Sequence, residues 1–385
     1  MLQKSSLLNH NTCIDVIIVG GGLAGLVSAI HLSKHGIEVL VIEKNSYPKH
    51  KVCGEYISNE VLPYLQSLGV DPLKLGAKKI NRFMLSTPKN KVIETKLPLG
   101  GFGISRFTLD FTLAKKAKDN GVTIIQDIVT DIKYLNGEFR VVTKNSGSYR
   151  AKITIGAHGK RSVVDVTLNR NFIKNKSPFL AVKSHLKGSF PDDLVALHNF
   201  KGGYCGLSKV ENNYINACYI ADFKSFQKFK NIQNFQKEVL YKNSFLKTIF
   251  ENSEPVFSKP LTISQLSFSS KEPVEQHILM CGDSAGMIHP LSGNGMSMAI
   301  RSAQMVSQLI INYFTGTIKS RMILEKIYEQ AWNDEFKKRL KTGHIIASLF
   351  KMNHFSELML FGLKSFPGLL PKIIKQTHGK PIILS

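Results

Sequence analysis

The chain has 385 residues, 43% of them hydrophobic, and a formal net charge of +23 at pH 7. This length is enough for a large core divided between two domains, and a mean hydropathy of −0.05 is typical of a soluble globular protein. The five cysteines are scattered without a CxxC pair, which argues for a reducing compartment and against a zinc site, a disulfide framework or the redox pair of disulfide reductases.

The N-terminal segment predicts no signal peptide, because residues 1–12 are polar and lead directly into a strand, so we expect a cytoplasmic protein.

The positive charge has three interpretations. Nucleic-acid binding is disfavoured, since the lysines and arginines do not cluster with interleaved aromatic residues. A solvated lysine-rich surface and attraction to an anionic membrane or an acidic substrate both stay open.

The first predicted unit, residues 15–44, is a strand, a glycine-rich turn, a helix and a second strand. The apolar run 16–19 ends at the turn of residues 20–25, and the apolar run 39–42 closes on Glu43. An acidic residue about twenty positions beyond a GxGxxG turn, in this context, is the fingerprint of a dinucleotide-binding fold.

Each part of this unit has a physical role in binding a pyrophosphate and a ribose. Gly20 permits the tight turn, Gly22 lets the backbone approach the phosphates, and Gly25 lets the helix pack closely on the strand. The helix N-terminus offers free N–H groups to the phosphates, and the Glu43 carboxylate can accept hydrogen bonds from both ribose hydroxyls. The predicted cofactor-binding positions here are Gly20, Gly22, Leu23, Ala24, Gly25, Glu43 and Lys44.

The rest of the chain divides into regions that differ in their predicted secondary structure. A loop over 46–54 precedes a predicted helix over 60–68, strands within 80–97, a helix over 107–120, strands over 122–125 and 127–132, and a hairpin of 139–142 with 149–155. From about residue 166, alternating strands predict an antiparallel sheet: 179–186, 194–199, 203–210 and 214–220. A buried strand at 279–281 and a helix over 296–313 follow, and the chain beyond residue 317 is mostly helical and basic.

A second informative segment covers residues 278–299, where a strand ends at a Gly-Asp pair and a Gly-Asn-Gly turn opens a helix. Together with the first unit, it resembles the two-domain FAD-dependent oxidoreductases that include aromatic hydroxylases, flavin halogenases and geranylgeranyl reductases. The resemblance implies that Asp283 binds the ribityl chain. It also implies that the helix opened by Gly293 and Gly295 directs its positive end at the flavin ring, favouring the anionic reduced form.

Shorter blocks extend the resemblance over most of residues 12–315. Lys51-Val52-Cys53-Gly54-Glu55 resembles the loop beside the isoalloxazine ring. Arg106, with Leu109 and Asp110 after it, resembles the block whose arginine contacts the FAD diphosphate or ribose, and Val129 would present its backbone to adenine.

One position departs from the family pattern. His158 stands where relatives carry Asp, and a histidine supplies no fixed negative charge, so the implied nicotinamide contacts do not transfer to it. A histidine held in the core or in a turn is the plainer interpretation of this position.

The resemblance implies a noncovalently bound FAD, with NAD(P)H as reductant, and no metal. The sequence has no second GxGxxG unit, so NAD(P)H would visit the flavin transiently, which counts against disulfide reductases and Baeyer–Villiger-type enzymes. The single tryptophan, Trp332, leaves no Trp-x-Trp pair, which counts against a typical flavin halogenase.

Three side chains near the expected flavin are chemically capable: Cys53, Glu55 and His289. Glu55 could orient substrate or relay a proton, or simply pair with Lys51. Cys53 is either a reactive thiol or a small packing residue, and His289, before a proline, either touches substrate or packs in the core. The Cys53-Gly54 pair favours the reductase branch of the family, whereas Glu55 in place of a second glycine favours the hydroxylases.

The C-terminal tail combines a basic cluster at 337–341 with apolar residues over 345–366 that charged residues interrupt. It is too interrupted for a spanning helix, which needs about twenty apolar residues. An interfacial amphipathic helix pair, a lid over a lipophilic pocket and a helix that caps the domain all fit the pattern.

We therefore predict an α/β fold in three parts. A Rossmann-like FAD-binding domain with a doubly wound, mostly parallel sheet takes residues 12–80, 100–165 and 270–315; an inserted antiparallel-sheet substrate domain takes 81–99 and 166–269; a helical basic region takes 316–385. The sheet of 179–220 would roof a dry pocket with Phe179, Leu180, Leu197, Phe200, Tyr204, Tyr214 and Tyr219.

The predicted activity is NAD(P)H-driven monooxygenation of a lipophilic or phenolic small molecule. Two alternatives stay open: flavin-dependent reduction of isoprenoid-type double bonds, as in geranylgeranyl reductases, and a non-catalytic flavoprotein sensor at a membrane. We expect a hydrophobic small-molecule substrate, no nucleic acid, and peripheral contact of the tail with the inner face of the membrane. The patterns carry no signal for the oligomeric state.

Overall fold

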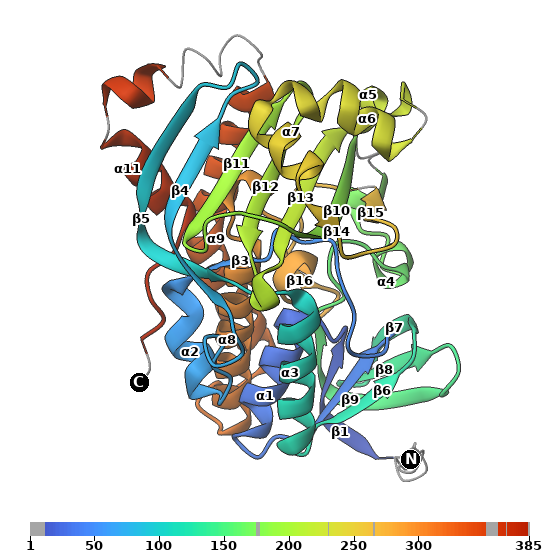
Figure 1. The fold of residues 1–385 in the computed structure, drawn as a ribbon. Helices are drawn as coiled ribbons and strands as arrows, with labels where there is room; N and C mark the ends of the chain where they lie inside the picture. Colours follow the sequence, from blue (N-terminus) through green and yellow to red (C-terminus); the bar gives the residue numbers. More distant parts are fainter. Residues whose placement is uncertain are drawn as a thin grey trace.

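A computed structural model describes residues 12–174, 178–229, 231–264, 266–351, 361–366 and 368–383 of the protein. The described strands form two sheets, one of eight strands and one of nine, which lie one above the other in Figure 1. Helices cover both sheets, and the chain beyond residue 320 runs along one side of the molecule (Figure 1). The mixed α/β fold confirms the predicted fold class.

The first sheet contains the predicted dinucleotide unit. Its central strands are β1 (Cys13–Val19), β2 (Val39–Glu43), β6 (Thr123–Gln126), β9 (Ser148–Gly156) and β17 (Ile278–Met280). They run parallel in the order β17-β9-β1-β2-β6, with β16 (Val274–Glu275) antiparallel at the edge. Strand β8 (Glu138–Thr143) pairs antiparallel with β9, as the predicted hairpin of 139–142 with 149–155 requires, and β7 (Val129–Leu135) pairs with the other edge of β8.

Three helices cover this sheet. Helix α1 (Leu23–Ser33) packs against α3 (Arg106–Asp119) and α8 (Gly295–Phe314), and it is buried on nearly every side. Since β1, β9 and β17 are parallel neighbours, their carboxyl ends meet at one edge of the sheet. Three segments far apart in the chain therefore gather at that edge: the glycine turn, the loop after β9 and the loop after β17.

The second sheet is the predicted substrate sheet, and it has the order β14-β10-β13-β12-β11-β4-β5-β3, with β15 paired to β10. Its strands are β3 (Tyr56–Ser58), β4 (Lys78–Ser86), β5 (Val92–Gly103), β10 (Phe179–Lys187), β11 (Leu194–Phe200), β12 (Gly203–Lys209), β13 (Ile215–Asp222), β14 (Glu254–Pro255) and β15 (Leu261–Ser264). All its pairs are antiparallel except β11 with β4, which are parallel.

One face of this sheet is covered by α5 (Phe223–Gln227), α6 (Ile232–Glu238) and α7 (Ser244–Glu251), drawn in yellow in Figure 1. Their side chains pack with alternate strand residues, among them Leu180, Phe200 and Tyr219. Successive residues of a strand point to opposite faces, so these three cannot roof a pocket on the other face. The prediction that they do so was wrong, whereas Leu197 and Tyr204 do face that side.

The C-terminal helices lie against the opposite face of the second sheet. Helix α9 (Arg321–Lys351) runs along α8, and α11 (Leu369–Thr377) packs on β5 and α9. Two hydrogen bonds fix the end of the chain: Asn294 Nδ2 donates to the Thr377 carbonyl (2.7 Å), and the Ile382 N–H donates to the Glu60 carbonyl (2.9 Å). Residues 352–360 of the predicted amphipathic tail lie outside the described residues.

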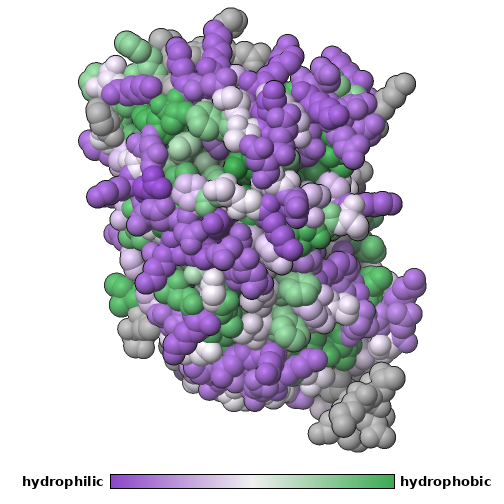
Figure 2. All heavy atoms as spheres, in the orientation of Figure 1, coloured by the Kyte–Doolittle hydropathy of each residue, from purple (hydrophilic) through white to green (hydrophobic). Residues whose placement is uncertain are grey.

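Within the part of the chain that the structure describes, no helix is both long and apolar enough to cross a membrane. On the face in Figure 2, hydrophilic residues are spread over both sheets, with apolar residues between them.

Candidate active site

The glycine turn has the close contacts that the motif predicts. Gly20 has φ +106°, and a Cβ on it would lie 2.4 Å from the Ala157 carbonyl oxygen. A Cβ on Gly25 would lie 2.0 Å from the Gly20 carbonyl oxygen, so α1 can pack this closely only with glycine there. A Cβ on Gly22, the N-cap of α1, would instead make ordinary contacts with two cations, Arg106 Nη2 at 3.7 Å and Lys51 Nζ at 3.9 Å. Leu23 and Ala24 are buried in the first turn behind it.

Glu43 is held in place at the end of β2. Its Oε2 accepts a hydrogen bond from the Gly21 N–H (2.7 Å), and its Oε1 accepts from the backbone N–H (3.0 Å) and side-chain amide (2.7 Å) of Asn45. The carboxylate therefore faces the glycine turn, where a ribose would lie, while Lys44 beside it is exposed. Val129 is buried at the start of β7.

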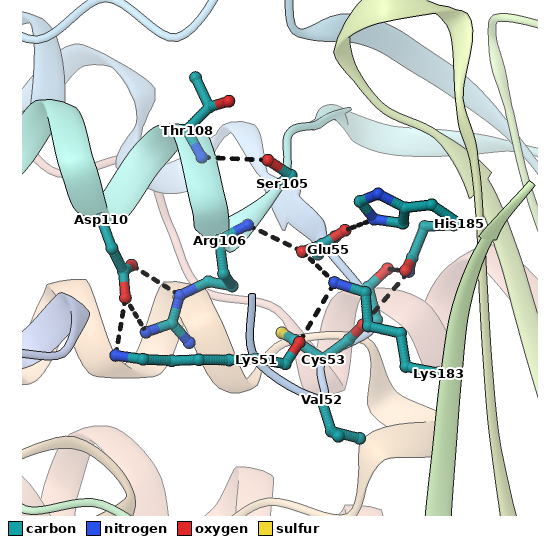
Figure 3. A network of polar contacts seen from close by, with 12 residues as sticks. Lys51, Val52, Cys53, Glu55, Ser105, Arg106, Thr108, Asp110, Lys183 and His185 are labelled. Carbon is teal, nitrogen blue, oxygen red and sulfur yellow. Dashed lines mark hydrogen bonds and ion pairs between the residues drawn. The ribbon is translucent and has the colours of Figure 1, made fainter. Parts of the chain in front are cut away.

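A buried carboxylate organises the two cations near Gly22. Asp110 accepts from Arg106 Nε (2.7 Å) and Nη2 (2.8 Å) and from Lys51 Nζ (2.8 Å), as Figure 3 shows. Burial alone would raise the pKa of Asp110, but the charges and hydrogen bonds of Arg106 and Lys51 hold it below its usual value. The three groups form a rigid, positively charged wall beside the N-terminus of α1, which suits a diphosphate.

Glu55 lies at the centre of a second buried network. It is fully buried and has φ +53°, so its backbone takes the left-handed form that glycine adopts freely. Its Oε1 accepts from the Arg106 N–H (2.8 Å) and pairs with Lys183 Nζ, and its Oε2 is hydrogen-bonded to His185 Nε2 (2.7 Å). The alternative that paired Glu55 with Lys51 was wrong, because the Lys51 ammonium pairs with Asp110.

The partners Lys183 and His185 were missed by the sequence reasoning. Both lie on β10, two residues apart, so they share the face directed at the 51–55 loop (Figure 3). Lys183 is fully buried and also donates to the Lys51 carbonyl (3.1 Å). Burial would raise the pKa of Glu55, yet the charge of Lys183 and the hydrogen bond of His185 lower it. Two basic residues at alternate positions of a predicted strand indicated that they share a face, but not which loop they contact.

The loop after β17 lies at the same edge of the first sheet as the glycine turn. Asp283 lies in a short 3-10 helix, and its carbonyl accepts from the buried Lys271 Nζ (2.7 Å). Gly293 has φ +62° and precedes Asn294, the N-cap of α8, which begins at Gly295. Within the described residues, the buried Ser292 Oγ and Asn294 Oδ1 have no hydrogen-bond partner. These open polar atoms and the α8 N-terminus are what the polar edge of a flavin would need.

His158 belongs to a buried ionic cluster behind this edge. Its Nε2 is hydrogen-bonded to Asp165 Oδ1 (3.0 Å), and Arg170 Nη1 bridges Asp165 (3.0 Å) and the Ser284 carbonyl (2.8 Å). This agrees with a histidine held in the core. Its Nδ1 is buried without a partner among the described residues, and its Cα lies next to Gly20 of the glycine turn.

The other two catalytic candidates have different surroundings. His289 packs against the rings of Phe268, Phe179 and Tyr204, and its Nδ1 accepts from the Leu291 N–H (3.4 Å). Cys53 is half-buried, and its carbonyl accepts from Asn216 Nδ2 (3.2 Å) on β13. The structure thus ties the Cys53 loop to the second sheet and places His289 in an aromatic cluster beside it.

A cavity of about 370 Å³ lies between the second sheet, α9 and α11. It reaches Gly54 and Gly293, the two loops predicted to bracket the flavin, and the C-terminal region supplies much of its wall, including Thr342, Ile345, Leu363, Leu370 and Ile373. Of the described residues that line it, none is an aspartate, glutamate, lysine or arginine. Its shape and apolar lining suit a hydrophobic small molecule.

Residues 13–331 match the family model described as "FAD binding domain". The chain belongs to this family. Similar curated proteins include an uncharacterized protein of Methanosarcina barkeri, 26% identical over 352 residues (88% of this chain, 84% of the relative), and the digeranylgeranylglycerophospholipid reductase of Methanosarcina acetivorans, 24% identical over 378 residues (93% and 89%).

Solved structures with a similar fold include a flavin-dependent brominase, with a TM-score of 0.77 and 17% identity over 95% of this chain and 93% of that one. A geranylgeranyl bacteriochlorophyll reductase-like protein of Thermoplasma acidophilum has a TM-score of 0.70 and 17% identity, with coverage of 95% and 92%. These findings confirm the predicted family, FAD as cofactor, and an FAD-dependent oxidoreductase. The individual cofactor contacts and the catalytic roles of Cys53, Glu55 and His289 stay predictions.

Proposed function

We propose that this FAD-dependent oxidoreductase acts on a lipophilic small molecule held in the 370 Å³ cavity. The single observation that supports this most strongly is that Gly54 and Gly293, from the two loops predicted to bracket the flavin, line the apolar cavity. A substrate there would touch the flavin while its apolar surface is removed from water.

The residues of the first sheet fit noncovalent FAD. The N-terminus of α1 at Gly22 would hold the diphosphate between Arg106 and Lys51, and Glu43 would accept from the ribose. Asp283 would bind the ribityl chain, and the N-terminus of α8 would stabilise negative charge on the ring. When bound, FAD takes two electrons from a donor such as NAD(P)H and passes them to oxygen or to substrate.

We infer hydroxylation of a lipophilic or phenolic substrate as the reaction. An oxygen-using flavin site must exclude water, and the cavity lining provides this exclusion. Glu55, fully buried behind the Cys53–Gly54 loop and linked to His185, is the side chain placed to hold or move a proton near the reacting end of the substrate.

Reduction of a carbon–carbon double bond is the second candidate, favoured by two observations. A curated relative is named as a reductase of a polyprenyl lipid. The cavity is also lined by Tyr204 and Cys218, and burial raises the pKa of both groups, that of Cys218 to about 12. Both therefore stay protonated at neutral pH and could donate the proton that a reduction requires.

Stopped-flow absorbance of the FAD-loaded protein, reduced by NADPH with and without oxygen, separates these reactions. A transient that absorbs at shorter wavelength than oxidised flavin supports hydroxylation. Reduced flavin that is stable to oxygen but is reoxidised by an isoprenoid alkene supports reduction. Failure of nicotinamide, ferredoxin and dithionite-reduced donors to support any turnover would leave the sensor alternative and contradict the proposal.

A further inference from the structure

One residue from each of five neighbouring strands forms a continuous row across the second sheet. In pairing register, Lys183 on β10 faces Cys218 on β13, which faces Gly206 on β12, then Leu197 on β11 and Leu85 on β4. Directly paired residues point to the same face of a sheet. This face is the one that lines the cavity, since the last four residues of the row all line it.

The row changes from polar to aliphatic along its length. Lys183 is bound to Glu55 and the Lys51 carbonyl, so this end adjoins the loop expected beside the flavin. Cys218 and Gly206 follow, and Leu197 and Leu85 complete the floor. Within the row itself the polar groups lie at the Lys183 and Cys218 end, whereas Gln376, Thr377 and His378 line the cavity on the α11 side.

The opposite end of the row faces the C-terminal helices. Leu363, Leu370 and Ile374 pack in one cluster with Ile80 and Leu97 of β4 and β5. A separate cluster contains Tyr204, Ile220 and Leu291, next to the flavin loops. The cavity therefore extends from the second cluster to the first, over three inter-strand steps or about 14 Å.

We propose that the cavity selects a single-chain amphiphile. Its polar, reacting end lies at Cys218 and Gly54, its apolar chain crosses Gly206 and Leu197, and α11 limits the length of the chain. The inference rests on the proposed function, because it assumes that the cavity is the substrate site. It adds the shape of the substrate and names α11 as the element that limits the length of its chain.

Gly206 is the point at which the proposal can be tested by size alone. A Cβ there would meet only Leu197 Cδ2 at 3.6 Å and the Cys218 carbonyl oxygen at 3.7 Å, both ordinary contacts. Gly206→Ala should therefore fit without strain, whereas Gly206→Phe would place a ring on the floor of the cavity midway along the row.

The probe is a series of radiolabelled 1-alkanols, from hexanol to hexadecanol, bound to the FAD-loaded protein in equilibrium dialysis. Each added methylene should tighten binding about fourfold until the chain reaches α11, after which the affinity levels off.

Gly206→Phe should bring this levelling-off to chains shorter by about four carbons, one inter-strand step, or more. Ile373→Trp on α11 should also shorten it, and it tests the same idea if Gly206→Phe does not fold. The matched control is Leu369→Trp, since Leu369 is the exposed neighbour of the buried Leu370, and it should keep the wild-type profile.

Levelling-off at the same length in wild type, Gly206→Phe and Ile373→Trp would overturn the proposal. That result would not touch the proposed function, which fails instead if the flavin cannot be reduced or never turns over. A protein with normal alkanol binding but an inert flavin would therefore retain the amphiphile site and lose the proposed oxidoreductase role for it.

Discussion

At the scale of single residues, two buried carboxylates organise the edge at which we propose that the flavin binds. Asp110 fixes the two cations that face Gly22, and Glu55 fixes the loop that joins the two sheets (Figure 3). Both are surrounded by cations, so each compensates a positive charge that would otherwise be buried without a partner. Their substitution should have effects of different kinds, one on the cofactor and one on the fold.

Asp110→Asn should weaken FAD binding by about tenfold, because Arg106 and Lys51 lose the charged hydrogen bonds that aim them at the diphosphate. The direction of the change in FAD affinity distinguishes this role from simple charge repulsion. Removal of a nearby negative charge would by itself tighten the binding of an anion. Fluorescence titration of the apoprotein with FAD measures the effect. Asp119→Asn, exposed at the other end of α3, should leave the affinity unchanged, and tighter binding in Asp110→Asn would refute the positioning role.

Glu55→Gln should lower the free energy of unfolding by about 3 kcal/mol at pH 7, because Lys183 is left buried without its counter-charge. The pKa of Glu55 lies below its usual 4.5 in the folded protein, so its contribution is present above the unfolded pKa and is lost as the pH falls through the folded pKa. The difference between wild type and variant should thus shrink on acidification. Urea denaturation at several pH values, with the surface variant Glu94→Gln as control, tests this, and a gap that widens in acid would contradict it.

At the level of residues, the geometry of the glycine turn agrees with a local motif, while its contacts with FAD stay a prediction. Gly20, Gly22, Gly25 and Glu43 lie at the turn as a strand–turn–helix fingerprint requires. The partners of Glu55 could not be predicted, because the nearest basic residue in the chain, Lys51, competes with Lys183 from a strand about 130 positions away. Only the fold decides between them.

At the scale of elements, the packing of α1 on β1 depends on one missing side chain. Gly25→Ala would force a methyl group to within 2.0 Å of the Gly20 carbonyl oxygen. The helix would have to move away from the glycine turn, at a cost of about 3 kcal/mol and with loss of FAD from the purified protein. Gly362→Ala, where nothing lies within 4 Å, should stay within about 0.5 kcal/mol of wild type. Thermal unfolding and the ratio of flavin to protein absorbance measure both effects, and full FAD content in Gly25→Ala would contradict the close-packing argument.

The hydrophobic periods predicted most elements, including α3, the β8–β9 hairpin and the strands of the second sheet. They did not predict which face of each strand packs against the covering helices and which face lines the cavity. Helices α5–α7 cover one face and the cavity lies on the other, so Phe200 and Tyr219 point away from the site that they were expected to roof. The parallel pairing of β11 with β4 likewise joins segments more than one hundred residues apart, beyond the reach of a local pattern.

At the scale of the whole molecule, the C-terminal region forms a wall of the cavity, and its contact with a membrane stays a proposal. Helix α11 closes the cavity with Leu370 and Ile374, in agreement with the lid interpretation. Of the basic cluster, Arg339 is buried against Glu60 and Glu335, so it is unavailable to a membrane. The exposed cations of the cluster are Lys337, Lys338 and Lys341.

If this region contacts an anionic membrane, changing those three lysines to glutamine should lower flotation with phosphatidylserine vesicles at low salt at least tenfold, since each cation contributes about 1 kcal/mol. The matched control removes three exposed lysines elsewhere: Lys115, Lys118 and Lys144. Equal flotation of the two triple variants would assign the +23 charge to a solvated surface alone.

A crystal structure of the FAD-loaded protein with 1-dodecanol tests the central claim most directly. The claim predicts the diphosphate at Gly22 between Arg106 and Lys51, the isoalloxazine ring between Gly54 and Gly293, and the alkanol in the cavity with its hydroxyl toward that ring. A flavin ring bound away from the mouth of the cavity, or a cavity with no access to it, would contradict the claim that this enzyme oxidises or reduces a molecule held there.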